Sequence, residues 1–290
     1  MTSRIWIGGG NDNVGNANDW SPFGVPLPGD TLNMQTGAMN IRGDDLAGNT
    51  LMIGGSSLTT LNLSHHAAVS VDIAQESVDQ VTVNVKGSDT LNIHTEFPSS
   101  GNFTINLADH ASLTANFNMV FSSAVINGGD DSRFTGGGLL EGSHVTIHAR
   151  ASGGSFAVQT AQSIPGRVEF GGSVSHNESV AVRGDPGRGI ASQVQIDQPG
   201  EFKGAVALGV FGEVDLMGLV NASSYAIKND ILSIYSGHKV IDNLRLTTPP
   251  APGLPTFNIT VAQTSAGIVI DRGVFHGNGT LLPVHSSGHV

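Results

Sequence analysis

Short runs of alternating apolar and polar residues dominate the chain up to about residue 220. Glycine, serine, aspartate and asparagine separate these runs, and a helical spacing of apolar residues is hard to find there. Because side chains alternate between the two faces of a strand, the pattern predicts short β-strands. The clearest runs are residues 61–63, 69–73, 81–85, 91–93, 103–107, 113–117, 145–149 and 168–170.

The apolar positions of these runs recur with a period of about 22 residues. Four columns stay apolar at this step: Leu61, Val83 and Ile105; Leu63, Val85 and Leu107; Val69, Leu91 and Leu113; Val71, Ile93 and Ala115. With a shortened turn the register continues through Ile126 and Ile147 to Val168. Since the rungs of a solenoid must repeat in register to bury one core, the period predicts strands stacked about 4.8 Å apart.

Two polar columns occupy the opposite face of the same strands. Thr60, Thr82 and Thr104 form one column, and Asn62, Asn84 and Asn106, preceded by Asn40, form the other. A flat face of this kind is a candidate surface for a glycan ligand. Cross-strand hydrogen bonds between identical side chains explain the same columns without any ligand. Both interpretations stay open on the sequence alone.

A turn of about 22 residues accommodates three strands of about five residues each with three corners. The sequence therefore predicts an all-β fold, a right-handed parallel β-helix of about eight turns over residues 35–220. Residues 1–34 are expected to form an N-terminal cap segment. In residues 221–290, two apolar runs flank a turn at 236–239. This arrangement predicts a C-terminal antiparallel β cap or small β-domain that covers the strand edges at the solenoid end and takes part in assembly.

Composition and charge narrow the classes of partner. The chain has 290 residues, with 13 lysines and arginines against 24 aspartates and glutamates, and a formal net charge of −11. Phosphate backbones repel such a protein, so we expect no nucleic-acid partner. No apolar run approaches the roughly 20 residues of a spanning helix, so we expect no membrane insertion. The chain has no cysteine, which excludes disulfides and thiolate metal sites.

The N-terminal segment carries a motif of its own: Trp6 followed by Gly8-Gly9, a second tryptophan at Trp20, and residues 28–31 (Pro-Gly-Asp-Thr) entering a strand. This segment resembles the opening motif of repeats in large bacterial surface proteins, the adhesins and autotransporter-type passengers with pectin-lyase-like β-helices. The resemblance implies a structural role outside a bacterium or at its surface, and it carries no catalytic residues. Because the first residues lack the apolar region of a secretory signal, we expect a signal-peptide-independent export route, with a cytoplasmic location as the alternative.

The sequence offers few candidate catalytic or metal-binding residues. Glycoside hydrolysis needs two carboxylates that face each other, whereas the adjacent pairs Asp44-Asp45 and Asp130-Asp131 point to opposite faces of a strand. We therefore assign no catalytic residue. A glycine-rich turn brings the oxygen ligands of Asp12, Asn13 and Asp19 together in the sequence, and Ca²⁺ prefers such ligands. We expect no required cofactor, with calcium as the one candidate.

These observations favour a non-enzymatic extracellular structural protein of bacteria that acts in adhesion, in a biofilm matrix or in a self-assembling surface filament. Open strand edges at the ends of a solenoid are templates for pairing, so the expected partner is a second copy of the chain, with a glycan as a further candidate. The alternatives are a carbohydrate-active β-helix enzyme (a polysaccharide lyase or glycoside hydrolase) and a cytoplasmic β-helical scaffold. The residues expected at the assembly contact are Ile5, Trp6, Ile7, Ile231, Ile234, Tyr235, Phe257 and Ile259.

Overall fold

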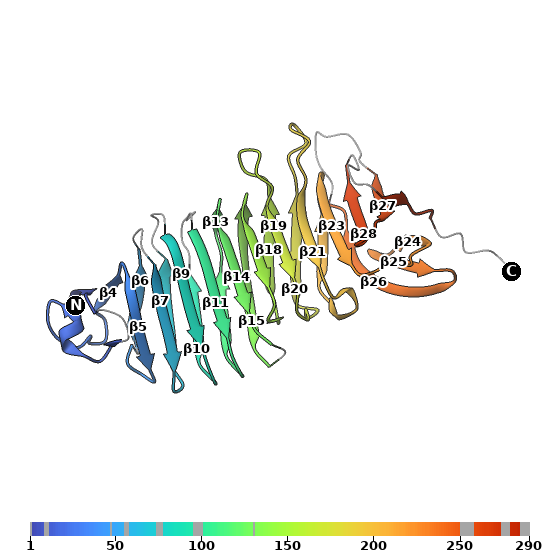
Figure 1. The fold of residues 1–290 in the computed structure, drawn as a ribbon. Helices are drawn as coiled ribbons and strands as arrows, with labels where there is room; N and C mark the ends of the chain where they lie inside the picture. Colours follow the sequence, from blue (N-terminus) through green and yellow to red (C-terminus); the bar gives the residue numbers. More distant parts are fainter. Residues whose placement is uncertain are drawn as a thin grey trace.

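The computed structural model describes residues 2–8, 12–46, 48–54, 58–73, 78–94, 101–129, 131–249, 258–273 and 279–284, without the side chains of residues 12, 73, 78 and 79. The chain forms an elongated stack of strands that leads from the N-terminus to the C-terminus (Figure 1). Within the described part, the only helical segments are two 3₁₀ turns, η1 (Ala17–Asp19) and η2 (Pro199–Glu201). The prediction of an all-β fold is confirmed.

Two long sheets build the stack, and the strands alternate between them along the chain. The larger sheet contains, in spatial order, β24 (Ser224–Lys228), β25 (Ile231–Ser236), β26 (Lys239–Thr247), β22 (Ala205–Leu208), β20 (Glu178–Arg183), β18 (Gly154–Gln159), β15 (Arg133–Glu141), β12 (Ser112–Asn116), β10 (Thr90–His94), β8 (Ala68–Ile73), β6 (Thr50–Ile53), β4 (Thr31–Met34), β1 (Ser3–Trp6) and β3 (Trp20–Ser21). Two short strands, β13 (Met119–Val120) and β17 (Arg150–Ala151), also pair with β15 and make this sheet 16-stranded.

The smaller sheet has 13 strands. Its spatial order is β2 (Asp12–Asn13), β5 (Gly37–Arg42), β7 (Thr59–Ser64), β9 (Val78–Val85), β11 (Gly101–Leu107), β14 (Ser123–Asn127), β16 (His144–Ile147), β19 (Arg167–Phe170), β21 (Ser192–Ile196), β23 (Gly212–Met217), β28 (Gly267–Arg272), β27 (Ile259–Gln263) and β29 (Thr280–Leu281). Neighbouring turns pair in parallel, and the result is a parallel β-solenoid of about eight turns with about 22 residues per turn, as predicted.

The expectation of three strands per turn is wrong for most of the solenoid, because a typical turn places one strand in each sheet. Within the described residues, a third strand appears only around β15, which pairs with β12 near its start and with β13 near its end. Glycine makes this long bent strand possible. A Cβ on Gly136 would lie 1.8 Å from the carbonyl oxygen of Ala115, and the φ of Gly136 is +153°. A residue with a side chain cannot take this position.

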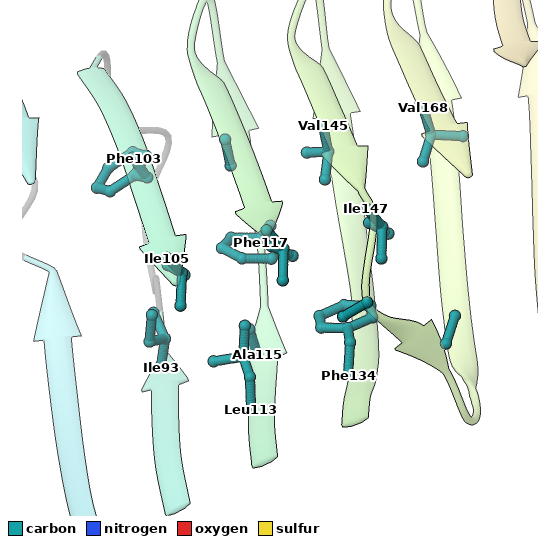
Figure 2. Close-up of a cluster of buried hydrophobic side chains, with 14 of the residues drawn as sticks. Ile93, Phe103, Ile105, Leu113, Ala115, Phe117, Phe134, Val145, Ile147 and Val168 are labelled. Carbon is teal, nitrogen blue, oxygen red and sulfur yellow. The ribbon is translucent and has the colours of Figure 1, made fainter. Parts of the chain in front are cut away.

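The predicted apolar columns form the interior of the solenoid. Leu61 pairs with Val83, and Val83 pairs with Ile105; all three side chains are buried. Figure 2 shows side chains of the two sheets that meet between them. Burying a side chain of this size stabilises a fold by about 1.5–3 kcal/mol, so the regular columns account for much of the stability.

One column departs from the predicted register. Ile126 pairs with Ile147 as expected, but Ile147 pairs with Phe170, whereas Val168 pairs with Val145. The turn between β16 and β19 is longer than the preceding ones because the segment after β18 forms an extra excursion, in which Ala161 and Ile164 make an isolated antiparallel bridge. A fixed step therefore reaches Val168 two residues too early.

A row of buried phenylalanines lies in the interior of the solenoid. The rings of Phe117, Phe134 and Phe156 are stacked, with centroids 6.3 and 6.1 Å apart. Phe170 and Phe202 continue the row in edge-to-face contacts at 6.2 and 5.6 Å. Such pairs contribute about 0.5–1.5 kcal/mol beyond the area that they bury. The row joins the middle of the solenoid to its C-terminal part.

The N-terminal end closes on itself. Strand β1 pairs in parallel with β4 and in antiparallel orientation with β3. The indole rings of Trp6 and Trp20 meet edge to face at 5.2 Å, and the Trp20 Nε1 donates to the carbonyl oxygen of Val14. The Arg4 Nε donates to the Asp30 Oδ2 at 2.8 Å. The two tryptophans and the aspartate of the N-terminal motif therefore have a structural role: their contacts hold the N-terminal end together.

At the C-terminal end the strands become antiparallel, as predicted. The meander of β24, β25 and β26 joins the larger sheet through the parallel pairing of β26 with β22. Strand β28 pairs with β23, and β27 pairs with both β28 and β29, all in antiparallel orientation. The two sheets therefore end in different antiparallel units.

Candidate functional site

The asparagine column on the smaller sheet is a continuous amide ladder. Asn40, Asn62, Asn84 and Asn106 lie in register, and Asn127 extends the column by one strand. Each Nδ2 donates to the Oδ1 of the preceding asparagine, over distances of 2.8 to 3.0 Å. Thr60, Thr82 and Thr104 are also in register. Because the amides bond to one another, the ladder stabilises the stack without a ligand.

The calcium prediction falls on the N-terminal loop. The side chain of Asp12 and residues 9–11 lie outside the described part, and Asn13 is exposed on β2. Asp19 belongs to η1, is buried, and has an Oδ2 without a hydrogen-bond partner. Among the residues that the structure describes, no group of three or more His, Cys, Asp or Glu side chains is arranged to hold a metal ion. Calcium at this loop stays a prediction.

An open groove of about 610 Å³ crosses the outer face of the larger sheet from β6 to β18. Asp72, His94 and Asn116 occupy successive strands in register within it, and the Asp72 Oδ1 lies 3.9 Å from the His94 Nδ1. Residues 136–138, all glycine, contribute no side chains and leave this part of the face hollow. The groove offers hydrogen-bonding groups along the solenoid axis, with no Phe, Tyr or Trp side chain in its lining.

A charged network covers the outer face of the smaller sheet beyond the amide ladder. The Arg167 Nη2 donates to the Glu169 Oε2 at 3.1 Å and to the Oε1 of Gln195. The His144 Nε2 lies 3.7 Å from the same Glu169 oxygen. Burial and the nearby Arg167 lower the pKa of His144, whereas Glu169 opposes that shift. The sequence pattern does not reveal this network, because its members come from different turns.

Three carboxylates meet where the solenoid joins the C-terminal strands. Glu213 on β23 is directly opposite Asp271 on β28, and Asp215 lies two residues further on the same face of β23. The Gln193 Nε2 donates to the Glu213 Oε1 at 2.9 Å and to the Asp215 Oδ2 at 2.5 Å. Burial and the Glu213 charge raise the pKa of Asp215 to about 7, with Arg167 opposing. The same two causes raise the pKa of Asp271 to about 7.

A further acid lies inside the solenoid. Glu178 alternates with the buried residues Val180 and Val182 at the start of β20, so its side chain faces the interior. Both of its carboxyl oxygens are buried and lack a hydrogen-bond partner. Burial raises the pKa of Glu178 to about 8. This acid is a structural weak point and does not reach any described surface.

The structure corrects part of the predicted assembly contact. Trp6 is 4% exposed and Ile234 is 0% exposed, so both pack in the core and cannot present a side chain to a partner. Their strands also have neighbours on both sides, as does β27, which holds the half-buried Ile259. Ile5, Ile7 and Ile231 are exposed as expected, and Tyr235 is half-buried. Phe257 lies outside the described residues.

Exposed large apolar side chains nevertheless gather at the two ends of the molecule. In the described part, the N-terminal end exposes Ile5, Ile7, Phe23, Val25 and Leu27, and the C-terminal end exposes Val220, Ile227, Ile231, Val240, Leu281 and Val284. The long solenoid between them exposes only Leu58, Phe121, Leu139 and Ile164 among its described residues. We call these two groups the N-terminal patch and the C-terminal patch.

The adjacent acids considered for catalysis do not form a facing pair within the described residues. The Asp45 Oδ2 accepts a hydrogen bond from the backbone of Arg42 and so caps a turn, and Asp130 lies outside the described part.

A scan against family models and searches of curated proteins and of solved structures find no match to the chain. The β-solenoid fold is compatible with structural and with enzymatic proteins. No helix in the described part is long and apolar enough to cross a membrane.

Proposed function

We propose that the chain is a non-enzymatic structural solenoid of the bacterial exterior that assembles head to tail with further copies of itself. The observation that carries this proposal is the concentration of exposed apolar side chains at the two ends. Exposed apolar patches on a folded protein mark interaction sites. Because the two patches differ, their contact is heterologous, and a heterologous contact that does not close into a ring produces a filament.

The charges at the two ends support the same contact. Residues 1–54 carry Arg4 and Arg42 against five aspartates, whereas residues 221–249 carry Lys228, Lys239 and Arg245 against two aspartates. The N-terminal end is therefore the more acidic one, and the meander of β24, β25 and β26 is slightly basic. Complementary charges of this kind steer two copies into one relative orientation.

Complementation between variants tests the assembly. One variant, Phe23→Ser with Leu27→Ser, removes the centre of the N-terminal patch; a second, Leu281→Ser with Val284→Ser, acts on the C-terminal patch. Sedimentation and negative-stain microscopy are expected to show filaments for the unsubstituted chain and monomers for each variant alone. A mixture of the two variants is expected to form dimers, because each retains one intact end.

The matched control changes exposed apolar residues in the middle of the solenoid. Leu58→Ser with Ile164→Ser alters side chains of similar exposure and is expected to leave the filaments intact. An unsubstituted chain that stays monomeric at high concentration overturns the assembly proposal. Fractionation of the native host locates the protein; recovery from the cytoplasm supports the alternative of an internal scaffold.

The groove on the larger sheet favours a second function, adhesion to a neutral glycan. The groove crosses successive strands about 4.8 Å apart, which suits an extended polymer, and the negative net charge disfavours anionic ones. Affinity electrophoresis in dextran and in hydroxyethyl cellulose is expected to retard the chain but not the His94→Ala variant. His148→Ala is the control, because His148 is exposed and directly follows β16 of the other sheet. Release of reducing or unsaturated ends would support the carbohydrate-active enzyme instead.

A further inference from the structure

The joint between the solenoid and its last hairpin is built on acidic side chains. The C-terminal hairpin, defined as β27 and β28 (259–272), extends the smaller sheet beyond β23 through the antiparallel pairing of β28 with β23 (Figure 1). In this pairing Glu213 is directly opposite Asp271. Side chains directly opposite each other in an antiparallel pair lie about 5 Å apart, and like charges in such positions are destabilising.

The groups around the joint do not neutralise this charge. The nearest strands contribute Asp215 from β23, Gln193 from β21, Arg167 and Glu169 from β19, His144 from β16 and Thr260 from β27. Gln193 donates to Glu213 and Asp215 but brings no charge. Arg167 is held by Glu169 and Gln195. Glu213 and Asp215 therefore share one amide donor, and the one cation among these groups, Arg167, is already paired with Glu169.

Burial prevents water from compensating. Asp271 is 3% exposed, and its Oδ1 is buried without a hydrogen-bond partner; the Oδ1 of Asp215 is in the same position. The neighbouring Arg272 does not help, because its Nη1 donates to the carbonyl oxygens of Leu208 and Pro249. A buried carboxyl oxygen without a donor is costly when charged and much less costly when the group is protonated.

We propose that Glu213, Asp215 and Asp271 form a shared-proton site that holds the C-terminal hairpin on β23 in weakly acidic solution and loosens it as the solution becomes neutral. Its ligand is the proton. The hairpin has two states, closed on β23 and open. Opening separates Asp271 from Glu213 and admits water to both. Closure is thereby coupled to the protonation of a buried carboxyl group.

The direction of the effect follows from proton linkage. The pKa of Asp271 is about 7 in the closed joint against 3.8 for an ordinary aspartate. Between these values the closed state holds a proton that the open state releases, so opening becomes easier as the pH rises. Above about pH 7 neither state holds the proton, and the opening equilibrium stops changing.

Hydrogen–deuterium exchange of the full chain tests this proposal, with rates corrected for the intrinsic pH dependence. We expect the protection of β27 and β28 to fall about tenfold per pH unit between about pH 5 and 7 and to level off above it. Asp271→Asn removes the titrating group and is expected to flatten this profile. The control is Asp197→Asn, a carboxylate near the end of β21 that bonds to Gln195 and is expected to keep the unsubstituted profile.

A second measurement avoids any effect of the substitutions on folding. Carbon-13 chemical shifts of the carboxyl groups in the unsubstituted chain follow each acid directly, and we expect the Asp271 signal to titrate near pH 7. A flat protection profile for the hairpin in the unsubstituted chain, an unchanged profile in Asp271→Asn, or titration of Asp271 at the ordinary aspartate value would each overturn the proposal.

Opening of the hairpin also bears on assembly, and this consequence rests on the proposed function. The hairpin pairs with β29, which carries Leu281 of the C-terminal patch. A loosened hairpin displaces part of that patch, so filaments are expected to be less stable at neutral pH than at weakly acidic pH. The exchange measurement is made on the chain below its assembly concentration. It therefore tests the shared-proton site even if the chain forms no filaments.

Discussion

At the scale of single residues, two acids are predicted to change stability in opposite directions with pH. Glu178 is buried in the interior without a partner, and its pKa is raised from 4.5 to about 8. Asp30 accepts hydrogen bonds from Arg4, from the backbone of Thr2 and from the backbone of Leu27, and its pKa is lowered from 3.8 to about 2. The environment decides the direction of the pKa shift in each case: desolvation favours the neutral acid and raises the pKa, whereas hydrogen-bond donors favour the charged acid and lower it.

Replacing Glu178 by methionine is expected to stabilise the protein at alkaline pH. In the native chain the folded state holds a proton on Glu178 that the unfolded state releases between pH 4.5 and about 8, so the free energy of unfolding falls over this window. The loss reaches on the order of 5 kcal/mol at about 1.4 kcal/mol per pH unit. Urea unfolding at several pH values measures it. The prediction fails if Glu178→Met and the native chain show parallel profiles.

Replacing Asp30 by asparagine is expected to destabilise the N-terminal end at neutral pH. The stabilisation from the depressed pKa of Asp30 is present above pH 3.8 and is lost as the pH falls toward 2. The difference between Asp30→Asn and the native chain is therefore largest at neutral pH and shrinks in acid. Exchange of the β1 and β4 amides reports it locally. A difference that persists unchanged at low pH would show that packing, rather than charge, supports this corner.

At the scale of elements, the bend of β15 is expected to tolerate no side chain. A Cβ on Gly137 would lie 1.8 Å from the carbonyl oxygen of Ser155, and backbone cannot move away without breaking the pairing of β15 with β18. We expect Gly137→Ala to lower the free energy of unfolding by about 3 kcal/mol, the upper end of the usual range for an overpacked site. Gly129→Ala is the control, since no heavy atom lies within 4 Å of its Cβ position. Equal midpoints for the two variants would contradict this account.

At the scale of the whole molecule, calcium is expected to raise the thermal midpoint modestly if the N-terminal loop binds it. A ligand that binds only the folded state stabilises it by mass action. The increase is expected in calcium relative to chelator and is expected to disappear in Asp19→Asn, which removes a carboxylate with a buried, unpartnered oxygen. Identical thermal midpoints in calcium and in chelator would show that the loop does not bind calcium.

The sequence by itself determined the repeating part of this molecule. A period of about 22 residues places Leu61, Val83 and Ile105 in one column and aligns the asparagines between them, and the structure has these pairs in register. The physical reason is that each turn of a solenoid contacts only the next one. The local alternation of apolar and polar residues and the constant period therefore suffice to predict nearly all of the stacked strands.

Only the tertiary structure decided what happens where the period breaks. The longer turn before β19 moves Phe170, rather than Val168, into the column of Ile147. Trp6 is buried against Trp20, and Ile234 packs in the hydrophobic core. Glu213 and Asp271 meet because the chain turns back on itself at the C-terminal end, and no periodic step links them. Contacts between segments that do not repeat depend on the path of the whole chain, which a local pattern does not contain.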